Sequence, residues 1–398
     1  MLKTLAIDEL EVGMFVQEIK LKNSDHKVKN QGKVNSPRTI ELLRKQGAAS
    51  VVVKLNPEQI AKLEQANQSS STTATQLDNT SDSPKGSVSL SDEFANSCRV
   101  YDEATENVKK LFSEAASGQQ LTTEKILVLA DEITESVFRN EYAMTILTRI
   151  RQQANYHWEH AINTAILMCG FGLYLGLNKP TVKKITLGAL FHDIGLARVP
   201  KAILEKQGPL TTNENSVVQK HISWGIEIGK RDNILNDVVI DMMANHHERL
   251  DGSGYPRGIQ QDKLSKLARI TAIIDVYDAM TGDRAYKKGI PPIAAMRHLM
   301  SESEKFDPQL VQKFIKFAGV YPVGSLVKLS NDKLGIITEG NREEPLKPKL
   351  KVIYSTQISS LVTPKNCDLT QEDISIVSAV RSEDYQLNLP RLIRDMTM

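Results

Sequence analysis

The spacing of apolar residues predicts a chain with a helical middle and shorter, strand-like runs on either side. From Asp92 to about Ala318, apolar side chains recur with the 3.6-residue period of an amphipathic helix. Within this region Thr211, followed three residues later by Glu214, forms a capping-box pattern. This pattern predicts the start of the helix that carries His221.

The N-terminal flank predicts a small α+β module over residues 1–66. Short β-prone runs at Met14–Ile19 and Ser50–Lys54 enclose one predicted helix over residues 36–47, which begins with a serine cap and a proline. The following stretch, residues 67–91, is about half serine and threonine and has almost no apolar side chains to bury. We therefore expect it to be a flexible linker.

The C-terminal flank predicts strands at Leu326–Leu329, Gly335–Thr338 and Leu350–Tyr354, separated by charged or proline-containing turns and followed by a polar tail. The predicted fold class is mainly α-helical, a helical bundle with a small N-terminal α+β module and a short C-terminal β appendage. The expected domains are residues 1–66 (module), 67–91 (linker), 92–139 (connecting helices), 140–320 (main helical domain) and 321–398 (β appendage and polar tail).

Composition and charge remove several classes of function. Lys and Arg number 50 against 48 Asp and Glu, so no electrostatic excess favours DNA, RNA or an anionic membrane. Three cysteines without a CxxC pair predict neither a disulfide framework nor a structural zinc site. The acidic start is unlike a secretory signal, and the apolar stretch Ala165–Leu177 is shorter than the roughly 20 residues of a membrane span. We expect a cytoplasmic protein without a membrane anchor.

Histidines cluster in one part of the helical region. Three polar positions lie inside predicted apolar helices: His192–Asp193 interrupts the run Ile185–Phe191, Asp275 interrupts Ile270–Met280, and His246 shares a helical face with apolar side chains. A buried, unpaired carboxylate is unstable, so each position needs a compensating charge. The six clustered histidines, out of eight, are His157, His160, His192, His221, His246 and His247.

Metal ions would compensate all of these groups together. Imidazole and carboxylate without thiolate suit iron, manganese or zinc, and seven ligands are too many for one tetrahedral ion, so we predict two metals. Two such ions can polarise a phosphoryl group and deprotonate a bridging water. Ordinary core histidines would explain any one residue alone, but not the whole set. The candidate ligands are His160, His192, Asp193, His221, His246, His247 and Asp275.

The ordered motifs resemble the HD-GYP domain, a bacterial, all-helical subgroup of the HD phosphohydrolases that hydrolyses cyclic di-GMP. The resemblance covers roughly residues 140–320, and residues 7–16 are similar to an uncharacterised module that often precedes such domains. The motifs are NYHWEHAIN (155–163), HDIG (192–195), HHERLDGSGYP (246–256) and DVYDAMTGDRAYK (275–287), with His221 between them.

The resemblance implies an HD-type bundle with two divalent ions, iron or manganese, and Asp193 and His192 as the catalytic residues. One ion would be held by His160, His192, Asp193 and Asp275, and the other by Asp193, His221, His246 and His247, with Asp193 bridging. Arg284 and Lys287 match the family's phosphate-contacting pair, and Tyr255 would form a pocket wall or a partner surface. Asp278 shares a helical face with Asp275 and would support a ligand.

One departure from the family leaves alternatives open. Leu196 stands where the family usually has lysine, and Arg198 could substitute for it. The main prediction is hydrolysis of cyclic di-GMP. The alternatives are a weakly active or inactive receptor signalling through the N-terminal module, a preference for mixed cyclic GMP-AMP, and a di-iron oxygenase, which the phosphate-binding Arg284 and Lys287 disfavour. A diguanylate cyclase or another signalling protein could bind the Gly-Tyr-Pro loop or the N-terminal module.

Overall fold

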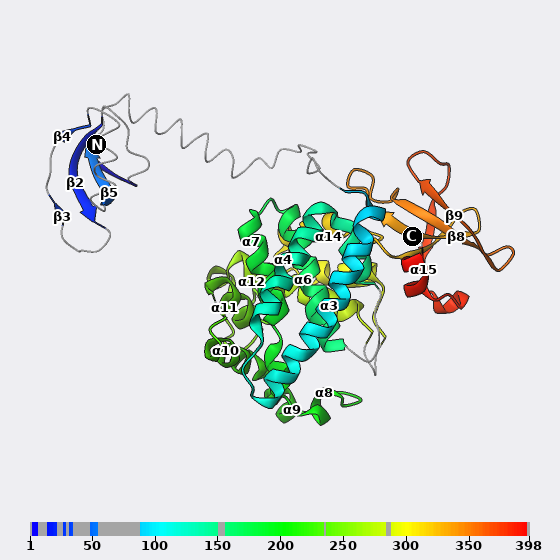
Figure 1. The fold of residues 1–398 in the computed structure, drawn as a ribbon, viewed down its shortest axis with the longest axis horizontal. Coiled ribbons are helices and arrows are strands. Elements are labelled where there is room, and N and C mark those ends of the chain that lie inside the picture. Colours follow the sequence, from blue (N-terminus) through cyan, green and yellow to red (C-terminus); the bar gives the residue numbers. More distant parts are fainter. Residues whose placement is uncertain are drawn as a thin grey trace. The chain divides into compact units, whose positions relative to one another are not determined.

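The structure, a computed structural model, contains two compact units, Met1–Asp82 and Ser83–Met398 (Figure 1). Within them it describes residues 2–6, 14–21, 27–28, 32–34, 48–54, 88–149, 156–234, 236–283 and 288–395. The boundary between the units falls inside the polar stretch that the sequence predicts to be a linker.

The N-terminal unit contains an antiparallel sheet. Its strand order is β1-β5-β2-β3, and β4 pairs with β2. Val16, Val51 and Val53 are buried on it, as the alternation of apolar residues in the two predicted runs requires. The helix predicted over residues 36–47 lies outside the described residues. The strands are β1 Leu2–Ala6, β2 Phe15–Leu21, β3 Lys27–Val28, β4 Gly32–Lys33 and β5 Ala48–Lys54.

The second unit is mainly helical, which confirms the predicted fold class. Helix α6 and the second half of α7 are buried on almost every side, and α6 packs against α3, α4, α5, α7 and α12. Among the described residues, no helix combines the length and the apolar character that a membrane crossing requires. The helices are α3 Leu90–Ser117, α4 Thr123–Arg139, α5 Glu141–Leu147, α6 Tyr156–Tyr174, α7 Lys179–Phe191, η4 Ile194–Arg198, α8 Lys201–Leu204, α9 Thr212–Gln219, α10 His221–Arg231, α11 Asp237–Asn245, η5 Gln261–Lys263, α12 Lys266–Thr281, α13 Pro292–Ser301 and α14 Pro308–Ala318.

The two helices expected to be mere connections are part of the bundle. Helix α3 packs against α4, α5, α6 and η4, and it runs along one face of the bundle in Figure 1. Buried Glu93 on α3 accepts hydrogen bonds from Arg139 on α4 at 2.6 and 2.8 Å. The linker also ends earlier than predicted. The Ser89 side chain caps α3, which begins at Leu90, because its hydroxyl accepts the Asp92 N–H.

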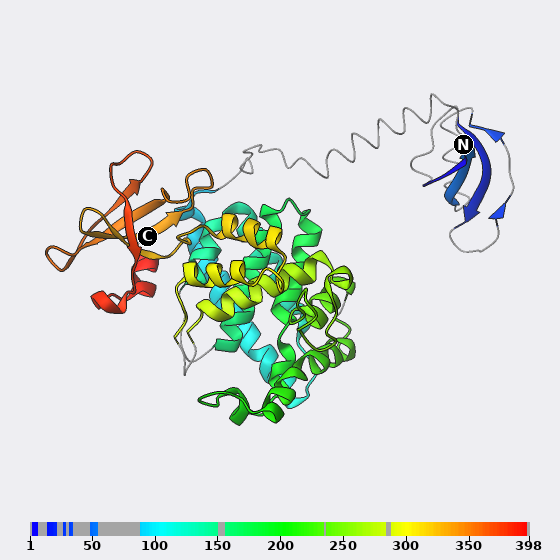
Figure 2. The same cartoon turned by 180° about the vertical axis from the view of Figure 1, so that it is seen from behind.

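The C-terminal part of this unit is a five-stranded antiparallel sheet in the order β10-β6-β7-β8-β9, which forms one end of the unit in Figure 2. The three predicted strands form β6, β7 and β8. The segment predicted as a polar tail contains regular structure, since two further strands complete the sheet and α15 buries Ile393. The elements are β6 Leu326–Leu329, β7 Lys333–Glu339, β8 Lys349–Ser355, β9 Ser360–Asp368, β10 Ile376–Ala379, η6 Glu383–Tyr385 and α15 Leu389–Asp395.

We expect limited proteolysis with a broad-specificity protease to cut first between residues 67 and 87. This stretch is too polar to bury, whereas Val88 already bonds to the Arg139 carbonyl of the helical unit. Mass spectrometry of the fragments should find a resistant product that starts near Val88 and still binds metal. Early cleavage inside the helical unit, with residues 67–87 intact, would contradict the prediction.

Candidate metal centre

Most of the predicted ligands lie where helices end or begin. The prediction that Asp193 lies inside an apolar helix is wrong. Helix α7 ends at Phe191, and Asp193, with φ −106° and ψ 9°, is the turn residue before η4. His246 and His247 likewise follow the last residue of α11. Only at such ends can adjacent side chains leave the helix toward a common point.

His221 begins its own helix, α10, and does not belong to the helix that starts after Thr211. The capping box at Thr211 forms as predicted, but the helix that it opens, α9, ends at Gln219. Gly195 makes the approach of His221 to Asp193 possible. A Cβ atom on Gly195 would lie 1.9 Å from the His221 carbonyl oxygen, so only glycine lets η4 pack this closely on α10.

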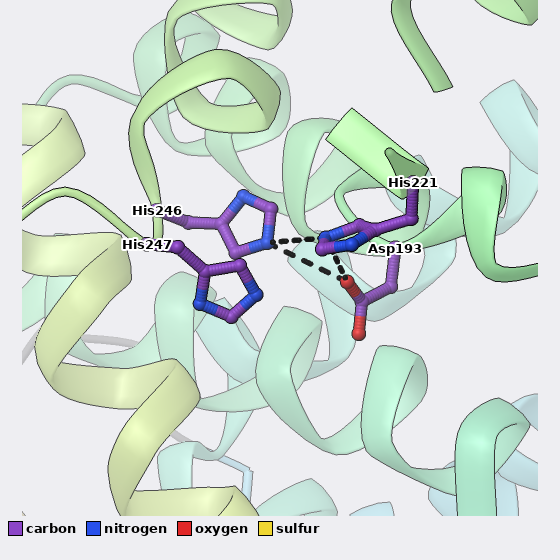
Figure 3. Close-up of side chains that lie close together, drawn as sticks. All are labelled: Asp193, His221, His246 and His247. Carbon is purple, nitrogen blue, oxygen red and sulfur yellow. Dashed lines mark hydrogen bonds and ion pairs between the residues drawn. The ribbon is translucent and has the colours of Figure 1, made fainter. Parts of the chain in front are cut away.

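The seven predicted ligands lie in two adjacent groups. Within each group, one ligand atom from every residue lies within 4.8 Å of the others. Asp193 faces both groups. Its Oδ1 lies 3.3 Å from His221 Nε2 and 3.5 Å from His246 Nε2. Figure 3 marks both contacts with dashed lines. Its Oδ2 lies 3.5 Å from His192 Nε2 and 3.8 Å from His160 Nε2. The first group is His160, His192 and Asp275, and the second group is Asp193, His221, His246 and His247.

Backbone carbonyls select the protonation of three imidazoles. In each case Nδ1–H donates to the carbonyl three residues earlier, so in the neutral ring Nε2 carries the lone pair. Two of these carbonyls lie in the last turns of α7 and α11, where carbonyls lack a helical partner. The hydrogen bonds join His192 to Ala189 (2.7 Å), His221 to Val218 (2.7 Å) and His246 to Met243 (3.0 Å).

The arrangement of the Nε2 atoms of these rings suits the binding of a cation. His221 Nε2 and His246 Nε2 lie 3.4 Å apart, although neither neutral ring has a proton to place between them. His192 Nε2 and Asp193 Oδ1 are buried and have no hydrogen-bond partner among the described residues. Converging lone pairs repel one another unless a positive charge lies between them. The donor set of imidazole nitrogen and carboxylate oxygen suits iron, manganese or zinc.

Burial keeps the imidazoles in the form that binds metal. Burial lowers the pKa of His192 to about 4, and it also lowers the pKa values of His221 and His247. For Asp275, burial acts to raise the pKa, but the hydrogen bond to His160 and the neighbouring histidines outweigh it and lower the pKa. At neutral pH the site therefore presents lone pairs and negative charge.

His160 contacts a carboxylate on each side of its ring. Its Nε2 lies 3.0 Å from Asp275 Oδ1, and its Nδ1 lies 2.8 Å from Asp278 Oδ2. The two aspartates are one turn apart on α12, and Asp278 is fully buried. A carboxylate on the outer nitrogen of a ligating histidine fixes its orientation and raises its basicity. Asp275 and Asp278, which were predicted to share a helical face, thus both contact the imidazole of His160.

Tyr255 lies against a candidate ligand. Its ring centroid is 4.6 Å from that of His247, and its backbone N–H donates to the His247 carbonyl at 3.2 Å. Gly254 permits this return of the chain, because a Cβ atom there would lie 2.4 Å from the Glu248 Cα. Tyr255 therefore forms one wall beside the second group of ligands.

Glu248 is a residue whose role sequence reasoning missed. Its carboxylate is almost fully buried and accepts the backbone N–H groups of Arg257 at 2.8 Å and Ile259 at 3.1 Å. It thereby closes the loop that carries Tyr255. The signal was available, since Glu248 directly follows the two histidines of the motif, but a single acidic residue does not specify its partners.

The predicted substrate contacts lie partly outside the described residues. Arg284 and Lys287 lie outside the residues that the structure describes. Leu196 is buried in the apolar core, and Arg198 donates to Glu227 on α10 at 3.0 Å. Arg198 therefore pairs with a carboxylate of its own unit, and this contact does not support a substitution for the missing lysine.

Three family matches cover most of the chain. Residues 143–310 match the HD domain, which is the part that contains both groups of ligands. Residues 2–126 match a domain of unknown function, and residues 326–388 match a KOW domain associated with the HD domain.

Characterised relatives extend these matches. The chain is 32% identical over 369 residues to a cyclic di-GMP phosphodiesterase of Pseudomonas aeruginosa, covering 93% of this chain and 89% of the relative. It is 30% identical over 216 residues to the 3'3'-cGAMP-specific phosphodiesterase 2 of Vibrio cholerae, covering 54% and 41%. A solved HDG"Y"P protein of Bdellovibrio bacteriovorus aligns over 79% of this chain and 98% of its own, with 15% identity and a TM-score of 0.47. By its near full-length match to the Pseudomonas enzyme and by its HD domain, the chain belongs to the HD-GYP family of phosphodiesterases.

Proposed function

We propose that this protein hydrolyses a phosphodiester bond of cyclic di-GMP at a centre of two divalent metal ions. The observation that carries the proposal is the position of Asp193, whose two oxygens face the two different groups of ligands. One carboxylate shared in this way places two ions close together. That arrangement is typical of enzymes that cleave phosphate esters.

Each of the two groups of ligands would bind one of the two ions. His160, His192 and Asp275 would hold one ion, and His221, His246 and His247 would hold the other, with Asp193 shared between them. Asp275 approaches the second group as well, since its Oδ2 lies 3.6 Å from His247 Nδ1. The donor set of nitrogen and oxygen ligands without thiolate suits iron or manganese, as it also suits zinc.

The protein supplies orientation and charge to this chemistry. When bound, the two ions polarise the phosphoryl group and provide a hydroxide at neutral pH. The three carbonyl-bonded imidazoles hold their Nε2 atoms toward the centre without rotating, and Asp278 keeps the proton on Nδ1 of His160. Tyr255 closes one side of the site. Arg284 and Lys287 would hold the phosphates through a bidentate fork and a point charge.

Cyclic di-GMP is the substrate that the full-length similarity supports. The relative whose name specifies cyclic di-GMP is matched over 89% of its length, whereas the relative specific for 3'3'-cGAMP is matched over 41%. The shared part extends beyond the metal ligands to both flanking modules. Recognition of a protein partner through the Gly-Tyr-Pro loop or the N-terminal module stays a prediction.

The test uses anaerobically purified protein whose metal content is measured before the assay. It is incubated with cyclic di-GMP and, separately, with mixed cyclic GMP-AMP, and the products are resolved by chromatography. We expect two metal ions per chain and a higher kcat/KM for cyclic di-GMP. His192→Ala should lose one metal ion and the activity, while His298→Ala, a histidine change outside the ligand set, should keep both ions and the activity. Absence of metal, or metal without hydrolysis of either compound, would overturn the proposal.

Leu196→Lys is expected to raise kcat/KM about tenfold. The family's lysine would add a charge-assisted contact of roughly 1.5–3 kcal/mol near the site, and a gain at the lower end of that range in the transition state corresponds to about tenfold. Arg198→Ala, the control, should change kcat/KM less than about twofold, because its guanidinium pairs with Glu227. Steady-state kinetics on both variants decides the matter. An unchanged rate in Leu196→Lys would mean that position 196 does not tune catalysis.

A further inference from the structure

Helix α3 makes a buried hydrogen bond to the helix that carries a metal ligand. The Tyr101 hydroxyl on α3 donates to Asn163 Oδ1 on α6 at 3.2 Å. Both side chains are buried, Tyr101 with 7% and Asn163 with 0% of its surface exposed. Tyr101 lies outside residues 143–310, the part that matches the HD domain, so this contact comes from a neighbouring segment.

Asn163 lies one turn after His160 on α6, so the two side chains project from adjacent faces of one helix. At His160, α6 is held by Asp275 and Asp278 of α12. At Asn163 it is held by Tyr101, and the Asn163 Nδ2 has no hydrogen-bond partner in the part of the chain that the structure describes. Both contacts therefore contribute to the orientation of α6, which also packs against α4, α5 and α7. A buried amide that loses its remaining hydrogen bond is destabilised in its position, which favours a movement that gives it another partner.

We propose that Tyr101 is a positioning residue for His160 and thereby for the metal ion of the first group. The inference rests on the proposed function, since it assumes that His160, His192 and Asp275 hold an ion. It assigns α3 a role that its place in the sequence does not reveal. Helix α3 also packs on η4, which directly follows Asp193.

The same contact offers the N-terminal region a route to the metal centre. The match to the domain of unknown function covers residues 2–126 and therefore includes Tyr101 and all of α3. A change in the orientation of α3 would move Asn163 and, one turn away, His160.

The test measures metal affinity in the full chain after its metal has been removed. Tyr101→Phe removes the hydroxyl and keeps the ring. Titration with Mn²⁺ should show an affinity about tenfold lower for the first group, and a change of less than about twofold for the second. Two double variants show which group loses affinity. The tenfold loss of Mn²⁺ affinity should persist when Tyr101→Phe is combined with His221→Ala, which lacks a second-group ligand. It should be absent when Tyr101→Phe is combined with His192→Ala. Tyr354→Phe, a tyrosine of similar burial in the C-terminal sheet, is the matched control and should bind as wild type does.

Each outcome separates this inference from the proposed function. Equal losses in both groups would reveal a general effect on folding and overturn the positioning role, as would unchanged binding in Tyr101→Phe while wild type binds two ions. Wild type that binds no Mn²⁺ would overturn the metal centre itself. Asn163→Leu, which removes the other partner, should reproduce the selective loss of the first ion. Normal binding in that variant would also contradict the proposal.

Discussion

Asp193→Ala is expected to lose hydrolysis by about 10³-fold or more and to bind at most one metal ion. The bridging carboxylate is the group that both sets of ligands share, and metal ions contribute several kcal/mol to transition states of phosphoryl transfer. Metal analysis together with kcat/KM on the purified variant measures both effects. Asp131→Ala, an aspartate that pairs with Lys183 at the surface, should keep full activity and metal. Two bound ions with near-normal turnover in Asp193→Ala would contradict the bridging role.

The same substitution separates function from stability. In the metal-free protein Asp193 Oδ1 lies 3.3 and 3.5 Å from two imidazole nitrogens but has no hydrogen-bond partner among the described residues, so removing it breaks no hydrogen bond of this atom. Truncation of a buried side chain to alanine ordinarily costs about 2–5 kcal/mol. We expect metal-free Asp193→Ala to lose less than about 1 kcal/mol of unfolding free energy, measured by denaturant titration in the presence of a chelator. A loss within the ordinary range would mean that the carboxylate stabilises the fold without metal.

Gly195→Ala is expected to have the second-largest effect. The added Cβ would lie 1.9 Å from the His221 carbonyl oxygen and 2.6 Å from the Gly225 nitrogen, and both are backbone atoms that cannot rotate away. Helix α10 would have to move away from η4 and carry His221 away from Asp193. Overpacking of this kind costs about 1–3 kcal/mol or more of unfolding free energy. Thermal unfolding and metal titration should show lower stability and loss of the ion held by the second group.

The control for this prediction is Gly340→Ala. Gly340 has an ordinary backbone conformation, and a Cβ atom there would make only a normal contact, 3.9 Å from Tyr142. It should leave both stability and metal binding unchanged within about 0.5 kcal/mol. Wild-type metal affinity for both ions in Gly195→Ala would show that α10 can move without carrying His221, which would contradict the argument from close packing.

Much of the fold and of the candidate site could be predicted from local patterns. Periodic apolar positions predict the helical middle and the strands β6 to β8, because burial repeats every 3.6 residues in a helix and every second residue in a strand. Polar residues inside apolar runs, such as His192 and Asp275, indicate the ligands, because buried charge needs compensation. The strands β9 and β10 were not predicted, since they are exposed along most of their length and lack an apolar signal.

The chain by itself determined which residues bear the chemistry, and the tertiary structure decided how they meet. Asp193 and His192 can be identified as candidate ligands from their residue type and their apolar surroundings. That one oxygen of Asp193 faces His221 and the other His192 depends on where α7 ends and on how closely η4 packs against α10. The contact of Tyr101 with Asn163 likewise joins two helices through residues that are 62 positions apart in the sequence. Periodicity reports only whether a position is buried, whereas the partner it meets is set by the packing of the whole bundle, which local patterns do not encode.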